Sequence, residues 1–168
     1  MKVKFIQSAV AVLFAGVLSA AESVVTLDAT STDITYTDNV AFANATRVVK
    51  IGTHKATIRF GAVLSSFAGE IEVQGGALKA DDLRNFGSPS KITVTKGATL
   101  DLTSDNREYG NLYKCDIRIA GTGVDGKGAV YRGNPYATGG INDLFGKMTL
   151  EEDATIGASC QVGFKSSA

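Results

Sequence analysis

Apolar and polar residues alternate in short runs along most of this chain. The clearest run is residues 91–102, in which Ile92 and Val94 would point to one face of a strand while the neighbouring threonines point to the other. After a turn at Gly97 the alternation resumes, with Leu100 on the same face as the first pair. The pattern predicts two short strands joined by a corner.

The same order of strand, glycine corner and strand recurs through the second half of the chain. Units anchored on Ile71, Ile92, Ile117 and Met148 follow one another at spacings of 21, 25 and 31 residues. One such strand pair cannot bury its apolar face alone, but stacked copies form a continuous core, as in a solenoid. A period of about 20 residues with glycine corners therefore predicts an all-β fold of the β-helix type.

The alternative fold is a β-sandwich built from the same short strands. We favour the β-helix because a sandwich has no reason to reuse one strand order at a near-constant period. Helical periodicity is almost absent after the first 21 residues. The one candidate is residues 80–86, where Leu83 and Phe86 would share a face of a short helical turn at a corner.

The repeats also carry a family resemblance. Residues 67–78 (FAGEIEVQGGAL) and 92–102 (ITVTKGATLDL) resemble the autotransporter-associated β-strand repeat of bacterial surface proteins. Residues 117–129 and 148–156 are similar to the portion that follows in such proteins. The resemblance covers roughly the second half of the chain, and its motifs are patterns of Gly, Thr and aliphatic residues that specify architecture better than activity.

The resemblance implies a right-handed parallel β-helix on the passenger side of a secreted protein. The chain departs from that pattern because no membrane-inserting barrel follows the repeats and the sequence stops within what should be another rung, at residues 161–164. We therefore expect either a fragment of a longer protein or a gene product that has lost its C-terminal part.

The first 21 residues predict a secretory signal peptide. Lys2 and Lys4 give a basic start, residues 5–18 are mainly apolar, and residues 19–21 are small. A membrane anchor is the alternative, but a spanning helix needs about 20 apolar residues and this run is shorter. The mature chain would then be residues 22–168.

The mature chain divides into two regions by the quality of the repeat. Residues 22–66 predict diverged or capping rungs, and residues 67–168 predict repeat-like rungs. The first region holds four alternating pairs: Val25 and Leu27, Ile34 and Tyr36, Val49 and Ile51, and Ile58 and Phe60. The polar segment 105–111 and the glycine-rich segment 121–145 predict loops that leave the solenoid at corners.

Charge argues against nucleic acid as a partner. The chain has 17 basic and 17 acidic residues, and loss of Lys2 and Lys4 with the signal would leave a net charge of −2. No basic stripe interleaved with aromatic residues is visible in the sequence. We therefore expect no nucleic-acid binding.

The segment 121–128 (GTGVDGKG) satisfies a dinucleotide-binding pattern and nearly satisfies a phosphate-loop pattern. Both motifs need a following helix, and residues 129–135 have neither the length nor the composition for one. We predict a glycine-rich corner loop and no nucleotide site. One partial copy of the calcium-binding nonapeptide, with Asp125, is equally weak because that motif works as a tandem array.

Carboxylates are the residues that a β-helical sugar lyase or hydrolase would need. Asp81 and Asp82 are adjacent and would face opposite ways, whereas Asp101 and Asp116 would project outward from separate strands. We expect all four carboxylates to be solvated side chains at outward positions that alternate with core residues. His54 is the only histidine, and we expect it on an exposed loop without a metal or a catalytic triad.

Cys115 and Cys160 are the only cysteines, and export to an oxidising compartment would allow them to pair. They lie 45 residues apart, about two rungs, and strands two rungs apart are roughly 9–10 Å from each other, which is beyond disulfide reach. If the segment 121–145 is an insertion that accounts for the extra residues between them, the two cysteines would fall on adjacent rungs. The sequence leaves this disulfide open, and we expect no metal site at either cysteine.

These features together predict an exported, non-enzymatic β-helical segment that is structural or adhesive, with no catalytic residue, cofactor or metal ligand. We expect its contacts to be self-association or surface glycans, with the membrane involved only through the signal peptide or a missing C-terminal region. The predicted location is the cell surface or the extracellular space, in association with a bacterial outer membrane, and the periplasm is the alternative. The alternative function is a carbohydrate-active enzyme of the pectate-lyase-like β-helix type.

Overall fold

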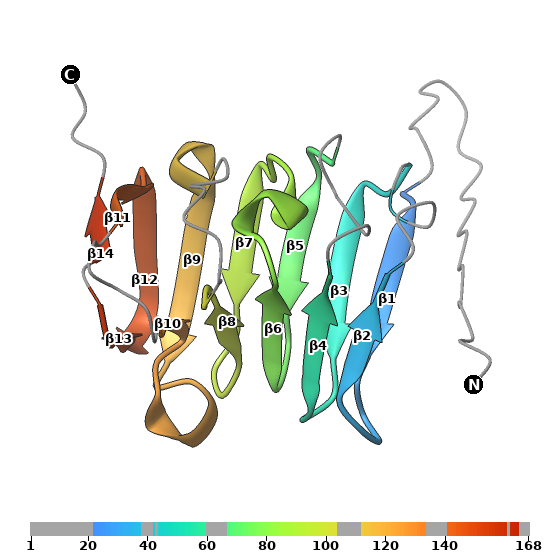
Figure 1. Ribbon diagram of the computed structural model, residues 1–168, viewed down its shortest axis with the longest axis horizontal. Coiled ribbons are helices and arrows are strands. Elements are labelled where there is room, and N and C mark those ends of the chain that lie inside the picture. The colour runs from blue at the N-terminus through green and yellow to red at the C-terminus, as the bar shows by residue number, and fades with distance from the viewer. Residues whose placement is uncertain are drawn as a thin grey trace, which may run out of the picture.

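The chain forms a parallel β-solenoid of about five turns. The computed structural model describes residues 22–37, 42, 44–59, 67–103, 112–133, 141–160 and 162–164. Figure 1 shows the strands following one another along the long axis, from the N-terminal rung in blue to the C-terminal rung in red. The predicted all-β parallel β-helix is therefore confirmed, and the β-sandwich is wrong. The predicted signal peptide, residues 1–21, and the predicted loop 105–111 lie outside the described residues.

Two six-stranded parallel sheets make the long walls of the solenoid. Sheet A contains, in order, β1 (Val24–Asp28), β3 (Arg47–Ile51), β5 (Glu70–Val73), β7 (Lys91–Val94), β9 (Asp116–Gly121) and β12 (Lys147–Ala154). Sheet B contains β2 (Ile34–Tyr36), β4 (Lys55–Ile58), β6 (Ala77–Ala80), β8 (Thr99–Asp101), β10 (Val130–Arg132) and β13 (Ile156–Ala158). Each turn of the chain contributes one strand to each sheet, and we call such a pair a rung.

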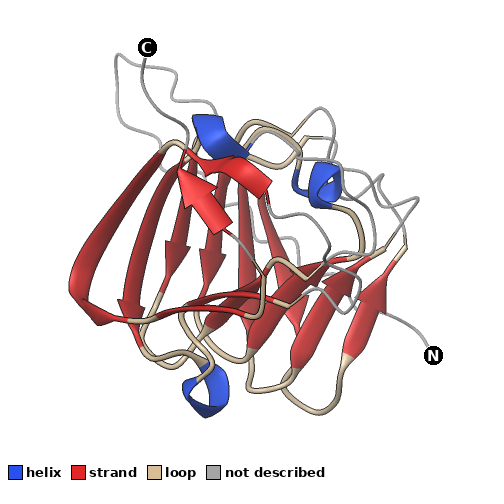
Figure 2. Cartoon of the chain, turned by 60° about the vertical axis from the view of Figure 1, so that its left-hand side comes forward, coloured by secondary structure: helices blue, strands red, loops and turns tan. Residues whose placement is uncertain are grey.

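The third side of the solenoid carries the connections from sheet B back to sheet A. It contains the short 3-10 helices η2 (Leu83–Phe86) and η3 (Leu112–Lys114), and sheet C, in which β11 (Ile141–Phe145) pairs with β14 (Val162–Phe164). A third 3-10 helix, η4 (Val124–Gly126), lies between β9 and β10, at a corner between sheets A and B. Figure 2 shows the two large sheets meeting along one edge.

The register of sheet A matches the repeat units predicted from the sequence. Ile71 pairs with Ile92, Ile92 with Ile117, and Ile117 with Met148. The same column extends back to the first rung, because Val25 pairs with Val48 and Val48 with Ile71. Residues of one type therefore stack at the same position of successive rungs, and the region 22–59 uses the same register as the later rungs.

The core consists of these stacked inward columns. A second column of sheet A and a column of sheet B supply further core residues. Those of their members that are apolar and under 2% exposed are Leu27, Val73, Val94 and Ile119 from sheet A, and Ala56, Leu78, Leu100 and Val130 from sheet B. β-branched and aliphatic side chains suit such strands because they pack well on a pleated surface. Full burial of each large side chain contributes about 1.5–3 kcal/mol.

Glycine permits the corners between sheets A and B, as predicted. Gly52 has φ of +82°, and a Cβ there would lie 2.4 Å from the backbone nitrogen of Thr30 in the preceding rung. Gly76 has φ of +56°, and its Cβ would lie 2.3 Å from the carbonyl oxygen of His54. Backbones of successive rungs approach so closely here that a side chain would have no space.

The structure corrects two sequence predictions and supports a third. Segment 121–145 is not a single loop, because it contains β10 and β11. In β3 the inward residues are Val48 and Lys50, so the expected alternating pair Val49 and Ile51 has the wrong phase. The short helical turn expected within 80–86 is η2, which buries both apolar residues. In the fourth pair of the first region, Phe60 lies outside the described residues.

Candidate functional site

The adjacent carboxylates Asp81 and Asp82 face different surroundings, as expected, and each has its own basic partner. The expectation of a solvated position is wrong for Asp82, which is buried. Asp81 Oδ2 accepts a hydrogen bond of 3.0 Å from Arg59 Nε. Asp82 is only 1% exposed, caps the N-terminus of η2 by accepting from Arg84 N at 2.8 Å, and forms an ion pair of 2.6 Å with the Arg84 guanidinium. These contacts give both carboxylates a structural use.

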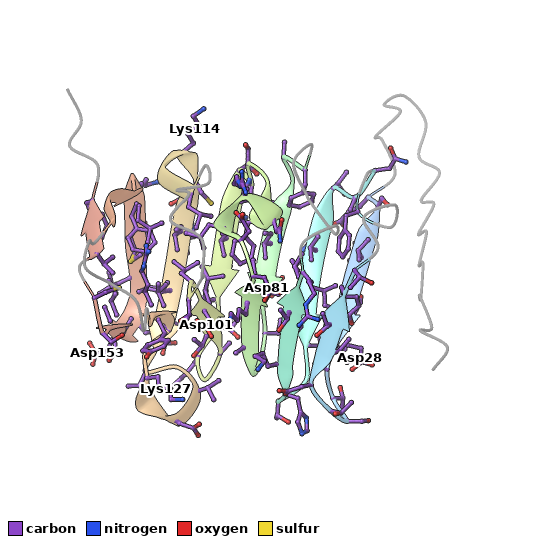
Figure 3. The ribbon with its side chains drawn as sticks, viewed as in Figure 1. Asp28, Asp81, Asp101, Lys114, Lys127 and Asp153 are labelled. Atoms are coloured by element: carbon purple, nitrogen blue, oxygen red, sulfur yellow. The ribbon has the colours of Figure 1, made fainter. Side chains whose placement is uncertain are left out.

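The other two candidate carboxylates lie on different sheets. Asp101 is at the end of β8 in sheet B, where its Oδ1 accepts from Thr103 N at 2.9 Å. Asp116 begins β9 in sheet A and lies within 3.2 Å of Arg118 Nη2 and 3.3 Å of Lys147 Nζ. Figure 3 places Asp81 and Asp101 on the sheet B wall. The structure therefore does not gather Asp101 and Asp116 on one face.

Asp116 belongs instead to a column of alternating charges on the outer face of sheet A. The register stacks Arg47, Glu70, Lys91, Asp116 and Lys147 at one position of five successive rungs. Lys91 Nζ lies 2.9 Å from Glu70 Oε1, in addition to the contact between the last two members. We call these five residues the charge ladder. Opposite charges directly across neighbouring strands stabilise the pairing, and like charges there would oppose it.

A second outward column widens this network. It stacks Glu72, Thr93, Arg118 and Thr149 on successive rungs. Glu72 pairs with Arg47 of the ladder, and Arg118 Nη1 lies 2.9 Å from Glu151 Oε1. An isolated exposed ion pair contributes about 0–1 kcal/mol, but here the pairs share partners and form a network.

Protonation equilibria follow these contacts. Desolvation raises the pKa of Asp116, but hydrogen bonds from Arg118 and Lys147 outweigh it, so the net pKa lies below its ordinary value. The pKa of Arg118 is raised by hydrogen bonds to Asp116 and Glu151. Asp116 and Arg118 therefore both stay charged at neutral pH.

Lys50 is a buried cation that the sequence analysis missed. It is 0% exposed and occupies an inward position between Leu27 and Val73. Its ammonium donates to three backbone carbonyls at the corners, those of Gly52 at 2.6 Å, His54 at 2.5 Å and Gly75 at 2.5 Å. Burial lowers the pKa of Lys50 to about 8, although Asp33 and Asp28 act in the opposite direction.

Arg132 is a second buried cation, 2% exposed, at the inward position of β10 beside Ala158. Its Nε and Nη1 have no hydrogen-bond partner among the residues that the structure describes. A charged residue inside a three-residue strand hides the apolar pattern, which explains why β10 was taken for part of a loop.

Cys115 and Cys160 are both free thiols, so the disulfide left open by the sequence is not formed in this structure. Cys115 precedes β9 of sheet A, is 1% exposed, and donates from Sγ to Asp116 O at 3.7 Å. Cys160 follows β13 of sheet B and donates from Sγ to Arg132 O at 3.9 Å. Burial, and secondarily the charge of Asp116, raise the pKa of Cys115 to about 12.

The glycine-rich segment 121–128 forms a closed corner loop around η4. Gly128 N donates to Thr122 O at 2.8 Å, and Val124 N donates to Thr99 Oγ1 at 2.8 Å. Asp125 adopts a positive φ of 52° within this loop. One of these donors is used within the loop and the other by the preceding rung. The loop leads into β10, not into the long helix that a nucleotide motif requires.

His54 is exposed at a corner, as expected, and its Nδ1 lies 3.1 Å from Thr30 O. Among the described residues, no group of three or more His, Cys, Asp or Glu side chains is placed to hold a metal ion. Within the same part of the chain, no helix is long and apolar enough to cross a bilayer.

Comparison of the chain with models of protein families, with curated proteins and with solved structures finds no significant match. The resemblance to the autotransporter-associated repeat therefore stays a prediction from the sequence. Function has to be argued from the geometry of the solenoid.

Proposed function

We propose that this protein is an exported, non-enzymatic β-helical segment with a structural or adhesive role at a bacterial surface. The observation that carries the proposal is the charge ladder, Arg47, Glu70, Lys91, Asp116 and Lys147, on the outer face of sheet A. Glu70 pairs with Lys91 and Asp116 pairs with Lys147 across neighbouring rungs, so charged side chains on this wall stabilise the stacking itself. A surface of this kind suits a rigid stalk.

The dimensions of the solenoid support the same role. Neighbouring strands in a sheet are about 4.8 Å apart, so six stacked strands extend roughly 24 Å along the axis. Length grows by one strand spacing with every added rung, whereas the cross-section stays constant. The predicted signal peptide and the family resemblance, both drawn from the sequence, supply the exported location in this proposal.

The first experiment separates the structural role from the pectate-lyase-like alternative. The purified protein is incubated with acidic and neutral polysaccharides, and cleavage is followed by the ultraviolet absorbance of unsaturated products and by reducing ends. We expect no turnover. Cleavage that is lost in both Asp101→Asn and Asp116→Asn, but kept in the matched control Asp28→Asn, would overturn the proposal in favour of an enzyme.

Export is tested separately. The full chain is expressed with a C-terminal tag in a bacterium that has two membranes, the cells are fractionated, and the N-terminus of the product is sequenced. We expect a product that begins near residue 22 outside the cytoplasm. An intact chain that begins at Met1 in the cytoplasm would contradict the exported role, whatever the result of the polysaccharide assay.

A further inference from the structure

Arg132 brings a positive charge into the apolar interior of the solenoid. It is the last residue of β10, is 2% exposed, and pairs with Ala158 of the following rung. On the other side, Leu102 N donates to Tyr131 O, which extends the pairing of β8 with β10 and places Leu102 next to Arg132. Leu102 is 0% exposed. Arg132 therefore lies between two rungs of the structure, and both of its neighbours in the column are apolar.

The charge of Arg132 has no partner in the described part of the chain. A guanidinium stays protonated at every pH at which proteins fold, so Arg132 cannot become neutral as a buried lysine can. Its Nε and Nη1 are covered by other atoms, yet neither donates a hydrogen bond to any residue that the structure describes. A buried charge is strongly destabilising when nothing neutralises it and nothing accepts its hydrogen bonds.

Two other charged side chains are buried in the described residues, and both are satisfied. Lys50 donates to three backbone carbonyls, and Asp82 forms an ion pair with the guanidinium of Arg84. Arg132 is the exception in this part of the chain. The fold therefore satisfies the other buried charges with its own groups, but leaves two donors of Arg132 for a different partner.

The surroundings of Arg132 restrict the chemistry of this partner. A guanidinium has only N–H donors, so the partner has to accept hydrogen bonds, and a single negative charge balances it. Lys50, the other buried cation that the structure describes, lies on β3, three rungs away. Sulfate or phosphate would bring more charge than one cation balances, and the close packing of a protein interior favours a small ion. These conditions describe a small monovalent anion.

We propose that Arg132 is the centre of an internal anion site, in which Nε and Nη1 of its guanidinium donate hydrogen bonds to one monovalent anion of about the size of chloride. The anion stabilises the solenoid because it neutralises a charge that is buried only when the rungs on both sides have formed. This inference goes beyond the proposed function and does not depend on export.

Urea unfolding at fixed ionic strength tests the site in solution. Sodium chloride is exchanged stepwise for sodium gluconate, whose anion is too large for a buried position, while the pH and the ionic strength are held constant. An anion that binds only to the folded chain stabilises it in proportion to the logarithm of its concentration once the site is filled. We expect the unfolding equilibrium constant of the wild type to fall about tenfold for each tenfold rise in chloride above the dissociation constant.

Arg132→Met assigns the effect to this side chain. Methionine removes the charge and fills much of the same space, so the dependence on chloride should disappear. In gluconate alone the variant should be at least as stable as the wild type, because its core holds no unneutralised charge. Arg59→Met is the matched control, since Arg59 follows β4 of the same sheet, is exposed and pairs with Asp81. This control should keep the chloride dependence, and circular dichroism checks the fold of both variants.

Crystals of the wild type grown in sodium bromide locate the anion without any substitution. Bromide has the charge of chloride and scatters anomalously, so we expect one anomalous peak within hydrogen-bond distance of the Arg132 guanidinium. The proposal is overturned if no peak lies there, or if wild-type stability does not depend on chloride at fixed ionic strength. It is also overturned if Arg132→Met keeps the dependence, or if this variant is less stable than the wild type by the same amount at every chloride concentration, since the partner would then be a group of the chain.

Discussion

The buried ammonium of Lys50 makes a specific prediction about stability at alkaline pH. In the folded protein the pKa of Lys50 is lowered from its ordinary value of 10.5 to about 8, mainly by burial. The unfolded chain therefore binds this proton more tightly than the folded chain between these two pH values. Stability rises with pH wherever the unfolded state holds more protons, so the Lys50 contribution to the free energy of unfolding should increase from pH 8 to pH 10.5.

The size of this effect follows from the two pKa values. One pKa unit corresponds to about 1.4 kcal/mol, so the difference between 10.5 and 8 corresponds to about 3 kcal/mol over the whole interval. This figure is an upper limit, because the carbonyl oxygens of Gly52, His54 and Gly75 accept hydrogen bonds from the ammonium and favour the charged form.

The assay compares urea unfolding of the wild type and Lys50→Met at a series of pH values from neutral to alkaline. Methionine keeps the volume of the side chain and removes its charge, so the difference between the two unfolding free energies isolates Lys50 from other titrating groups. That difference should shift in favour of the wild type as the pH rises through the interval. Lys79→Met, which removes a lysine from the outward side of β6, controls for the loss of a positive charge. A difference curve for Lys50→Met that is flat, or that falls with pH, would refute the reasoning.

Three further predictions concern the corners, the core and the thiols. Gly52→Ala should destabilise the fold by at least about 2 kcal/mol more than Gly97→Ala. The reason is that a Cβ at Gly52 would meet backbone atoms at 2.4 Å, whereas nothing lies within 4 Å of a Cβ at Gly97. Equal midpoints of urea unfolding for the two variants would contradict this prediction. Ile92→Ala, at a fully buried position in the middle of its column, should cost about 2–5 kcal/mol in thermal or urea unfolding, and a loss below about 1 kcal/mol would argue against the stacked core. In the native protein a thiol reagent should modify Cys160 much faster than Cys115, whose pKa is raised to about 12 by burial, and equal rates would show that Cys115 is accessible.

Much of the fold could be predicted because a solenoid repeats local information. Ile71, Ile92, Ile117 and Met148 begin equivalent strands, and the structure pairs them as neighbours. Each unit carries its own strand pattern and glycine corner, so a short window of sequence is enough to recognise it. The failures occur where a charged residue interrupts this local pattern. Lys50 hid the phase of β3, and Arg132 hid β10.

The candidate site was less predictable, because it depends on which residues stack across rungs. Asp116 was recognised as an outward carboxylate, but its partner Lys147 is 31 residues away in the sequence. The charge ladder exists only once the register of five rungs is known, since its members are never close along the chain. The two cysteines show the same limit, because their separation in sequence does not reveal that they end up beside different sheets.

By itself, the sequence determined the fold class, the repeat unit and the positions of its corners, since apolar alternation and glycine act within a few residues. The tertiary structure alone decided which charges meet and which cations are buried. Several of the charge contacts join residues 20 or more positions apart, as for Arg47 with Glu72 or Arg118 with Glu151. A buried lysine such as Lys50 needs partners for its ammonium, and these come both from its own corner, at Gly52 and His54, and from the next rung, at Gly75. The alternation of apolar and polar residues does not encode that arrangement.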